Sequence, residues 1–283
     1  IAEDKDFDAI KEMIYRYGAV QSSIYMDMGG TKVTSEYYDP ENTSYYYNGE
    51  DEVNHDILII GWDDDYPAEN FTKTPSKNGA FLCQNSWGEG FGDGGRFYVA
   101  YDDTQIGRNC VAYTRIDGMD NYDHLYQTDL CGWVGNMGYK KESCWFANAY
   151  TADSTQTLRA VGFYATGPES DYEIYVAADF KNEMSLVLPK KIQKGHLERK
   201  GFYTIDLKKE IPIAEGERFA VMVKINTPGS DYPVAMEYRA DDQTANVNLE
   251  DGCGYVSVDG YRWSRIEEEY GGNICLKAYT DNR

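Results

Sequence analysis

Apolar positions near the start of the chain recur with the period of a helix. In the segment DFDAIKEMIYRYG the apolar residues that share one face are Phe7, Ile10, Ile14 and Tyr17. This spacing of 3, 4 and 3 residues predicts an amphipathic helix, and Gly18 is placed to end it. The next stretch, AVQSSIYM, predicts a strand.

A polar, tyrosine-rich segment and three further apolar runs follow. Residues 29–52 contain GG, DPEN and NGED, which predict a long irregular segment. Beyond it lie three runs that lead into or out of polar loops, namely VNHDILIIGWDDD, GAFLCQNSWG and GGRFYVAYDD. The first part of the chain is therefore expected to combine a helix with a mostly antiparallel sheet.

The hydrophobic pattern changes near residue 118. From about residue 122 onward, short runs with a period near two are separated by turn signals, as in RAVGFYAT, DYEIYVAAD, GFYTIDL, RFAVMVKI, GYVSVDG and NICLKAY. Such a succession is typical of a β-sandwich or jelly roll. The sequence therefore predicts an α+β protein that is mostly β, with two domains at residues 1–118 and 119–283.

Composition and charge narrow the class of protein. The formal net charge of −21 would repel a phosphate backbone, so nucleic acid is not an expected partner. No run reaches the roughly 18 consecutive apolar residues of a membrane helix, so no membrane span is expected. The 26 tyrosines, with abundant Asp, Asn and Gly, favour a secreted or cell-surface protein. The six cysteines show no CxxC spacing, which argues against a zinc ribbon and leaves open whether they pair.

One histidine and one asparagine are candidates for acid–base chemistry. His55 opens the apolar run DILIIGW, and Asn85 stands in QNSWG at the end of the next apolar run. An imidazole that moves protons needs a partner on its second nitrogen, which an amide can supply, and the indole of Trp87 would keep water from that bond. A histidine without a role and an ordinary glycine-rich hairpin are the alternatives.

Two segments together resemble a known enzyme family. NHDILIIGWDDD followed by GAFLCQNSWGEGFGDGGRFYVAYDD resembles the His and Asn segments of the papain-like cysteine peptidases, over roughly residues 5–115. The resemblance implies the β-rich half of a papain-like fold. It implies that His55 is the general base and later acid, that Asn85 orients it, and that Trp87 shields their hydrogen bond. In such enzymes a thiolate attacks the scissile carbonyl and the imidazolium protonates the leaving amine.

The nucleophile of that family has no counterpart in the chain. The family's Cys opens a long helix upstream of the His, but no cysteine precedes Cys83. Cys83 lies in a strand pattern and Cys110 follows the third strand, so neither fits. We therefore expect the nucleophile on an N-terminal segment or companion chain of the same peptidase, and residues 1–283 alone to be inactive. A catalytically inactive binding or adhesion protein with a relic half-site is the alternative.

The resemblance also implies residues that contact a protein or peptide substrate. Ser23, Val53 and Asp56 fall at or beside positions that line the specificity pocket for the second residue before the cleaved bond. The carboxylate of Asp56 would favour a basic substrate side chain. A solvated carboxylate that points away from His55 is the alternative.

The second half has a resemblance of its own. YQTDLCGWVGNMGY, SCWFANAYTADSTQTLRAVGFYAT and YEIYV resemble the lectin-like domain that follows papain-like domains in some bacterial cell-surface peptidases. The resemblance implies a β-sandwich with a surface, glycan or cell-wall attachment role. Trp133, Trp145 and Trp263 are candidates to stack on sugar rings, with packing in the sandwich core as the favoured alternative.

No cofactor is expected, apart from a structural calcium ion that the second resemblance allows. The candidate oxygen ligands are Asp241, Asp242 and the acidic run at residues 63–65. Because nothing in the sequence matches an EF-hand loop, solvated acidic turns account for the same residues.

Overall fold

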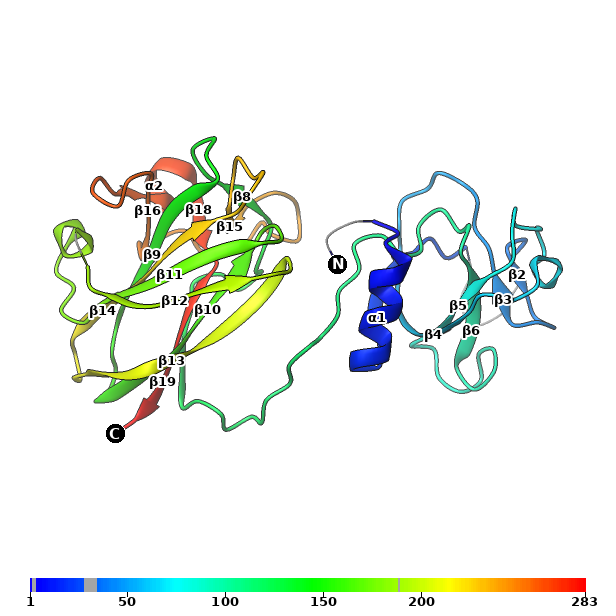
Figure 1. The fold of residues 1–283 in the computed structure, drawn as a ribbon, viewed down its shortest axis with the longest axis horizontal. Coiled ribbons are helices and arrows are strands. Elements are labelled where there is room, and N and C mark those ends of the chain that lie inside the picture. Colours follow the sequence, from blue (N-terminus) through cyan, green and yellow to red (C-terminus); the bar gives the residue numbers. More distant parts are fainter. Residues whose placement is uncertain (2–3, 28–34, 188) are drawn as a thin grey trace. The chain divides into compact units, whose positions relative to one another are not determined.

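The computed structural model describes residue 1 and residues 4–27, 35–187 and 189–283. Contacts divide the chain into two compact units, one that extends to Ile116 and one at Asp117–Arg283 (Figure 1). This division lies close to the expected boundary between residues 118 and 119. The first unit holds one helix and a sheet, and the second is built from strands, as the α+β, mostly β prediction requires.

The predicted N-terminal helix is α1 (Phe7–Tyr17). The carboxylate of Asp6 accepts a hydrogen bond from the Ala9 N–H at 3.0 Å, which satisfies one of the free donors of the first turn. Gly18 ends the helix with φ at 93°, a left-handed conformation that costs glycine little, and donates its N–H to the Ile14 carbonyl. The buried face carries Ile10, Met13 and Ile14, and Phe7 packs partly buried against the same core, as the spacing predicted. Tyr17, which the spacing also placed on this face, is 45% exposed.

Six strands form the sheet of the first unit, in the order β1-β4-β5-β6-β3-β2. Their bounds are β1 (Val20–Ile24), β2 (Tyr38–Asp39), β3 (Ser44–Tyr45), β4 (His55–Asp63), β5 (Ala80–Gln84) and β6 (Arg96–Ala100), with a short 3-10 helix at Ala68–Asn70. All pairs are antiparallel except β3 with β6. The two shortest strands fall in the segment expected to be irregular, of which residues 29–34 lie outside the described residues.

One face of this sheet packs on the helix. Along β4 the side chains of Ile57 and Ile59 are buried, whereas Asp56 and Leu58, which alternate with them, are exposed. This alternation is typical of a strand with one covered face. The buried set forms the core of the first unit together with the apolar face of α1.

The second unit contains three sheets. A four-stranded sheet has the order β13-β10-β19-β7, a six-stranded sheet β12-β11-β14-β9-β16-β17, and a three-stranded sheet β18-β15-β8. The strands are β7 (His124–Tyr126), β8 (Gly135–Met137), β9 (Ser143–Thr151), β10 (Gln156–Ala165), β11 (Ser170–Ala177), β12 (Lys191–Leu197), β13 (Gly201–Ile213), β14 (Arg218–Asn226), β15 (Val234–Tyr238), β16 (Gly254–Ser257), β17 (Ser264–Arg265), β18 (Gly272–Ile274) and β19 (Leu276–Asn282). The helical turns are η2 (Glu183–Leu186) and α2 (Ile266–Tyr270). All pairings among these strands are antiparallel.

Two apolar clusters cover opposite sides of strand β9. Phe146 belongs to the main core of the second unit, together with Phe163 and Phe219. Trp145, its neighbour in sequence, belongs to a second cluster that includes Trp263. Trp145 therefore packs against a second hydrophobic cluster, on the opposite face of β9 from the main core, because successive strand residues point to opposite faces of a sheet.

The third candidate tryptophan lies apart from both of these clusters. Trp133 packs against Tyr164, with ring centroids 5.4 Å apart, and the Lys200 ammonium lies 4.9 Å from its ring. Its indole N–H donates to the Asn136 side chain at 2.7 Å. All three candidate tryptophans thus make contacts within the protein.

The described cysteines are all free thiols. Among the described residues no helix is long and apolar enough to cross a membrane.

Candidate active site

His55 stands at the first position of β4, where two hydrogen bonds of the preceding residue fix the start of the strand. In the register with β1 it lies opposite Ile24. The preceding residue, Asn54, donates its N–H to the Ile24 carbonyl at 3.1 Å, and its side-chain oxygen accepts the Met26 N–H at 2.7 Å. Asn54 therefore holds the position from which the imidazole projects, a role that the sequence reasoning did not assign to it.

Asn85 follows β5 directly and is held by the glycine-rich loop behind it. Its N–H donates to the Gly95 carbonyl at 2.9 Å, and the Gln84 amide donates to the same carbonyl at 2.9 Å. Gly95 has φ at 87°, and a Cβ there would lie 2.7 Å from the Gln84 nitrogen. Only glycine fits this position without displacing Gln84, so the loop closes tightly behind Asn85.

The two candidate side chains meet. His55 Nε2 lies 2.9 Å from Asn85 Oδ1, and the same oxygen accepts the Ser86 N–H at 2.7 Å. Because an amide oxygen can only accept, Nε2 must carry the proton of this bond. The neutral ring then has its lone pair on Nδ1, which has no hydrogen-bond partner among the residues described. The geometry thus leaves Nδ1 free to exchange a proton.

Trp87 lies beside this pair. Its ring centroid is 4.9 Å from that of His55, and Phe91 packs edge-on against the indole at 5.2 Å. Asn85 is only 4% exposed. A hydrogen bond removed from water is electrostatically stronger than one in contact with water, so this packing strengthens the His55–Asn85 bond.

Two of the three candidate substrate contacts, Ser23 and Asp56, lie together. Ser23 faces Asp56 across β1 and β4, and its hydroxyl donates to the Asp56 carboxylate at 2.6 Å. Val53 precedes β4 and is 40% exposed. Asp56 lies on the opposite side of β4 from the buried Ile57. The structure therefore brings Ser23 and Asp56 together on an exposed surface next to the strand that carries His55.

The cysteines of the first unit do not have the features of a nucleophile. Cys83 lies within β5 and is fully buried, and Cys110 is 4% exposed. Burial raises the pKa of both thiols above the ordinary value. A reactive thiolate needs a lowered pKa and access to substrate, so neither residue fits that role.

Three of the acidic residues considered for calcium, Asp63, Asp64 and Asp241, accept hydrogen bonds within the protein. One oxygen of Asp241 accepts the N–H groups of Gln243 and Thr244, and one oxygen of Asp63 accepts the Asp65 N–H. Asp64 accepts the Tyr101 hydroxyl and pairs with a lysine. Within the described ranges no group of three or more His, Cys, Asp and Glu side chains is arranged to hold a metal ion.

Comparison with protein families matches both units. Residues 2–116 match the model of the papain family cysteine proteases, and residues 125–280 match the model of the lectin-like domain. The chain therefore belongs to the lectin-like domain family, and its first unit matches the papain family cysteine proteases, which confirms both resemblances and the fold class.

Two solved structures that resemble the chain over its full length are of one protein, Cwp84. A structure described as the clostridial cysteine protease Cwp84 after propeptide cleavage matches with a TM-score of 0.86 at 23% identity, covering 100% of this chain and 70% of that one. The cysteine protease and lectin-like domains of Cwp84, a surface layer associated protein of Clostridium difficile, match with a TM-score of 0.82 at 23% identity, covering 100% and 63%. No curated protein matches the sequence.

Proposed function

We propose that the chain is the His- and Asn-bearing part of a cysteine-type endopeptidase. The observation that supports this most directly is the 2.9 Å bond between His55 Nε2 and Asn85 Oδ1, which leaves Nδ1 free. The nucleophilic Cys lies on a segment outside residues 1–283, since neither Cys83 nor Cys110 is accessible. The substrate is a protein or peptide, and residues 1–283 alone are inactive.

In the proposed reaction His55 moves one proton in each direction. Nδ1 takes the proton of the external Cys thiol, and the thiolate attacks the scissile carbonyl. The imidazolium then returns the proton to the leaving amine, and water releases the acyl group. Asn85 keeps the Nε2 proton in place, and Trp87 keeps water away from that bond.

The second unit is proposed to attach the peptidase to a surface. Two observations support this role, the match to the lectin-like domain and the description of Cwp84 as a surface layer associated protein. We propose a secreted or cell-surface bacterial protein whose second unit contacts a cell-wall or glycan surface. We also propose that the protein can bind a structural calcium ion. A rise in melting temperature on addition of calcium would support this, because a ligand that binds the folded state stabilises it.

A thiol-directed peptidase inhibitor tests the proposed nucleophile. An epoxysuccinyl inhibitor should add one label to the protein that includes its upstream segment, on a cysteine of that segment. Residues 1–283 alone should stay unlabelled, because burial suppresses the reactivity of Cys83 and Cys110. Intact mass and peptide mapping read the result, in a Cys131→Ser background that removes an exposed thiol. Absence of label on the longer protein would favour the inactive binding protein instead.

Asp56 is expected to favour a basic residue two positions before the cleaved bond. Asp56→Ala should lower the preference for Arg and Lys at that position by about two- to fivefold, the range for one solvent-exposed ion pair. A peptide library digested by the complete peptidase measures this preference. Glu69→Ala removes the same charge from the exposed 3-10 helix and should change nothing. An unchanged Arg and Lys preference in Asp56→Ala would show that Asp56 is only a solvated carboxylate.

A further inference from the structure

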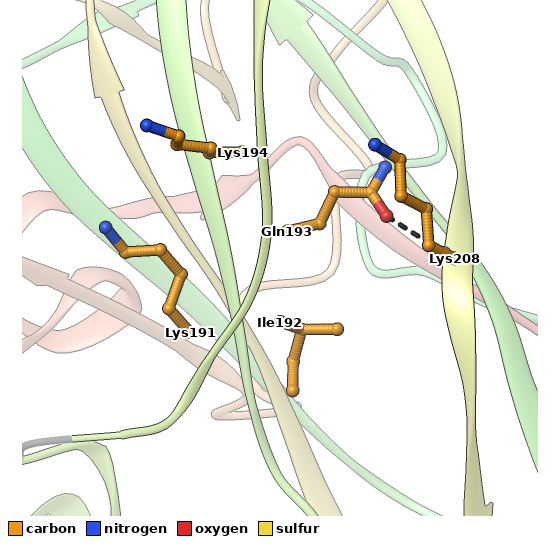
Figure 2. Close-up of a pocket in the computed structure, with 5 residues that line it drawn as sticks. All are labelled: Lys191, Ile192, Gln193, Lys194 and Lys208. Carbon is orange, nitrogen blue, oxygen red and sulfur yellow. Dashed lines mark hydrogen bonds between the residues drawn. The ribbon is translucent and has the colours of Figure 1, made fainter.

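A basic hollow lies on the second unit, where the edges of two sheets meet. β12 is the edge strand of the six-stranded sheet, β13 is an edge strand of the four-stranded sheet, and residues 198–200 join them. The hollow has a volume of about 430 Å³ and is lined by Lys191, Ile192, Gln193, Lys194 and Lys208 (Figure 2).

Irregular pairing on both strands shapes this hollow. The register between β11 and β12 shifts at Ile192, and the register between β10 and β13 shifts over residues 207–210. Such bulges re-aim side chains at sheet edges. Gln193 connects the strands, because its side-chain oxygen accepts the Lys208 N–H at 2.9 Å and its amide donates to the Asp206 carbonyl at 3.2 Å. The lysines thus project from a cross-linked backbone.

The charge of this region is opposite to that of the whole chain. Residues 190–210 contain seven Lys and Arg residues against three Asp and Glu residues, in a chain of net charge −21. Lys191 pairs with Glu173 at 2.9 Å. Lys194 and Lys208 are exposed and form no ion pair with any described acid. Two ammonium groups of the hollow therefore have no carboxylate partner within the described part of the chain.

The directions of the lysines favour an extended ligand. Figure 2 shows Lys191 and Lys194 extending on one side of β12, while Lys208 rises from β13 and Gln193 lies between the strands. A single small anion would contact one ammonium group, whereas a chain with repeated anionic groups can contact several. Ile192 adds an apolar surface to the hollow.

We propose that this hollow binds a linear anionic glycan, a sugar chain that bears phosphate or carboxylate groups, through Lys194 and Lys208. The inference rests on the proposed attachment role of the second unit and names the chemistry of its ligand. A sugar chain is favoured over an acidic polypeptide because the unit matches the lectin-like domain over residues 125–280. Since lysines contribute point charges, the affinity falls as the salt concentration rises.

Binding of defined polymers to residues 1–283 tests this site. The probes are a phosphomannan, polygalacturonate, neutral dextran and poly-L-glutamate. The double variant Lys194→Gln/Lys208→Gln should bind the anionic glycan at least about tenfold more weakly, which corresponds to the loss of two charge-assisted contacts. Lys140→Gln/Lys141→Gln removes the same charge from exposed lysines elsewhere in the unit and should bind like the wild type. Melting temperatures verify that each variant is folded.

The possible outcomes test the attachment role, the lysine site and the class of ligand separately. A wild-type chain that binds none of the three glycans would overturn both the attachment role and this inference. Binding that survives in Lys194→Gln/Lys208→Gln would overturn the site alone, as would an equal loss in the Lys140→Gln/Lys141→Gln control. Equally tight, lysine-dependent binding of poly-L-glutamate would overturn the assignment to a glycan. Comparison of the phosphomannan with polygalacturonate identifies the anionic group.

Discussion

His55→Ala is expected to lower kcat/KM for peptide hydrolysis by at least about a thousandfold in the peptidase that includes the upstream segment. The substitution removes the group proposed to take the thiol proton and to return it to the leaving amine. It should leave the fold intact, because His55 is only partly buried at the start of β4. Hydrolysis of a fluorogenic peptide measures the rate, and melting temperature measures stability. A variant that keeps a tenth of the activity would rule out His55 as the base.

The second unit provides a matched control for this substitution. His124 Nε2 lies 2.8 Å from Asn282 Oδ1, a histidine–asparagine bond of the same kind outside the proposed site. His124→Ala should leave hydrolysis unchanged. Asn85→Ala should have an intermediate effect, on the order of a hundredfold, because the base remains but its tautomer and position are no longer fixed. This order of effects would separate a positioning role for Asn85 from the proposed chemical role of His55.

Lys277→Met is expected to destabilise the second unit by about 3–5 kcal/mol, the cost of breaking a buried ion pair from one side. The Lys277 ammonium lies 2.6 Å from the Asp129 carboxylate, whose side chain is fully buried. Burial raises the pKa of Asp129, while the nearby ammonium opposes that rise. Without Lys277 the carboxylate would be buried with no cation, so the free energy of unfolding should fall. Urea denaturation followed by tryptophan fluorescence measures this change.

Two comparisons separate this charge effect from a loss of packing. Asp129→Asn/Lys277→Met removes both charges and should recover most of the lost stability. Because the pKa of Asp129 is raised in the folded protein, protonation favours the folded state. The difference between Lys277→Met and wild type should therefore narrow as the pH falls from neutral to about 4, where the unfolded carboxyl also takes up its proton. A constant difference over this pH range would point to packing instead.

The elements that carry the candidate site were predictable because each has a strong local pattern. The 3, 4, 3 spacing predicted α1, and the apolar run after His55 predicted β4. Asn85 was placed by its motif at the end of β5. The supporting roles of Asn54 and Gln84 were missed, since each polar residue acts through a backbone group far from it in sequence.

The sequence predicted that the second unit is built from strands, but not which side chains of each strand pack against the other sheet. An alternating pattern requires one covered face, whereas β14 is buried on both sides along most of its length. Its continuous apolar run therefore could not show which residues meet the other sheet. For the same reason the sequence could not show on which face of β9 the side chain of Trp145 packs.

By itself the sequence determined the two units, the class of each fold, and the two side chains proposed to move and hold a proton. Local spacing and short motifs carry this information, because they depend on neighbouring residues. Only the tertiary structure decided that His55 Nε2 meets Asn85 and that Nδ1 is left free. Only the tertiary structure also decided that the bulged edges of β12 and β13 gather lysines around one hollow. The first depends on a contact between residues 30 apart in sequence, and the second on the register between paired strands, neither of which a local pattern specifies.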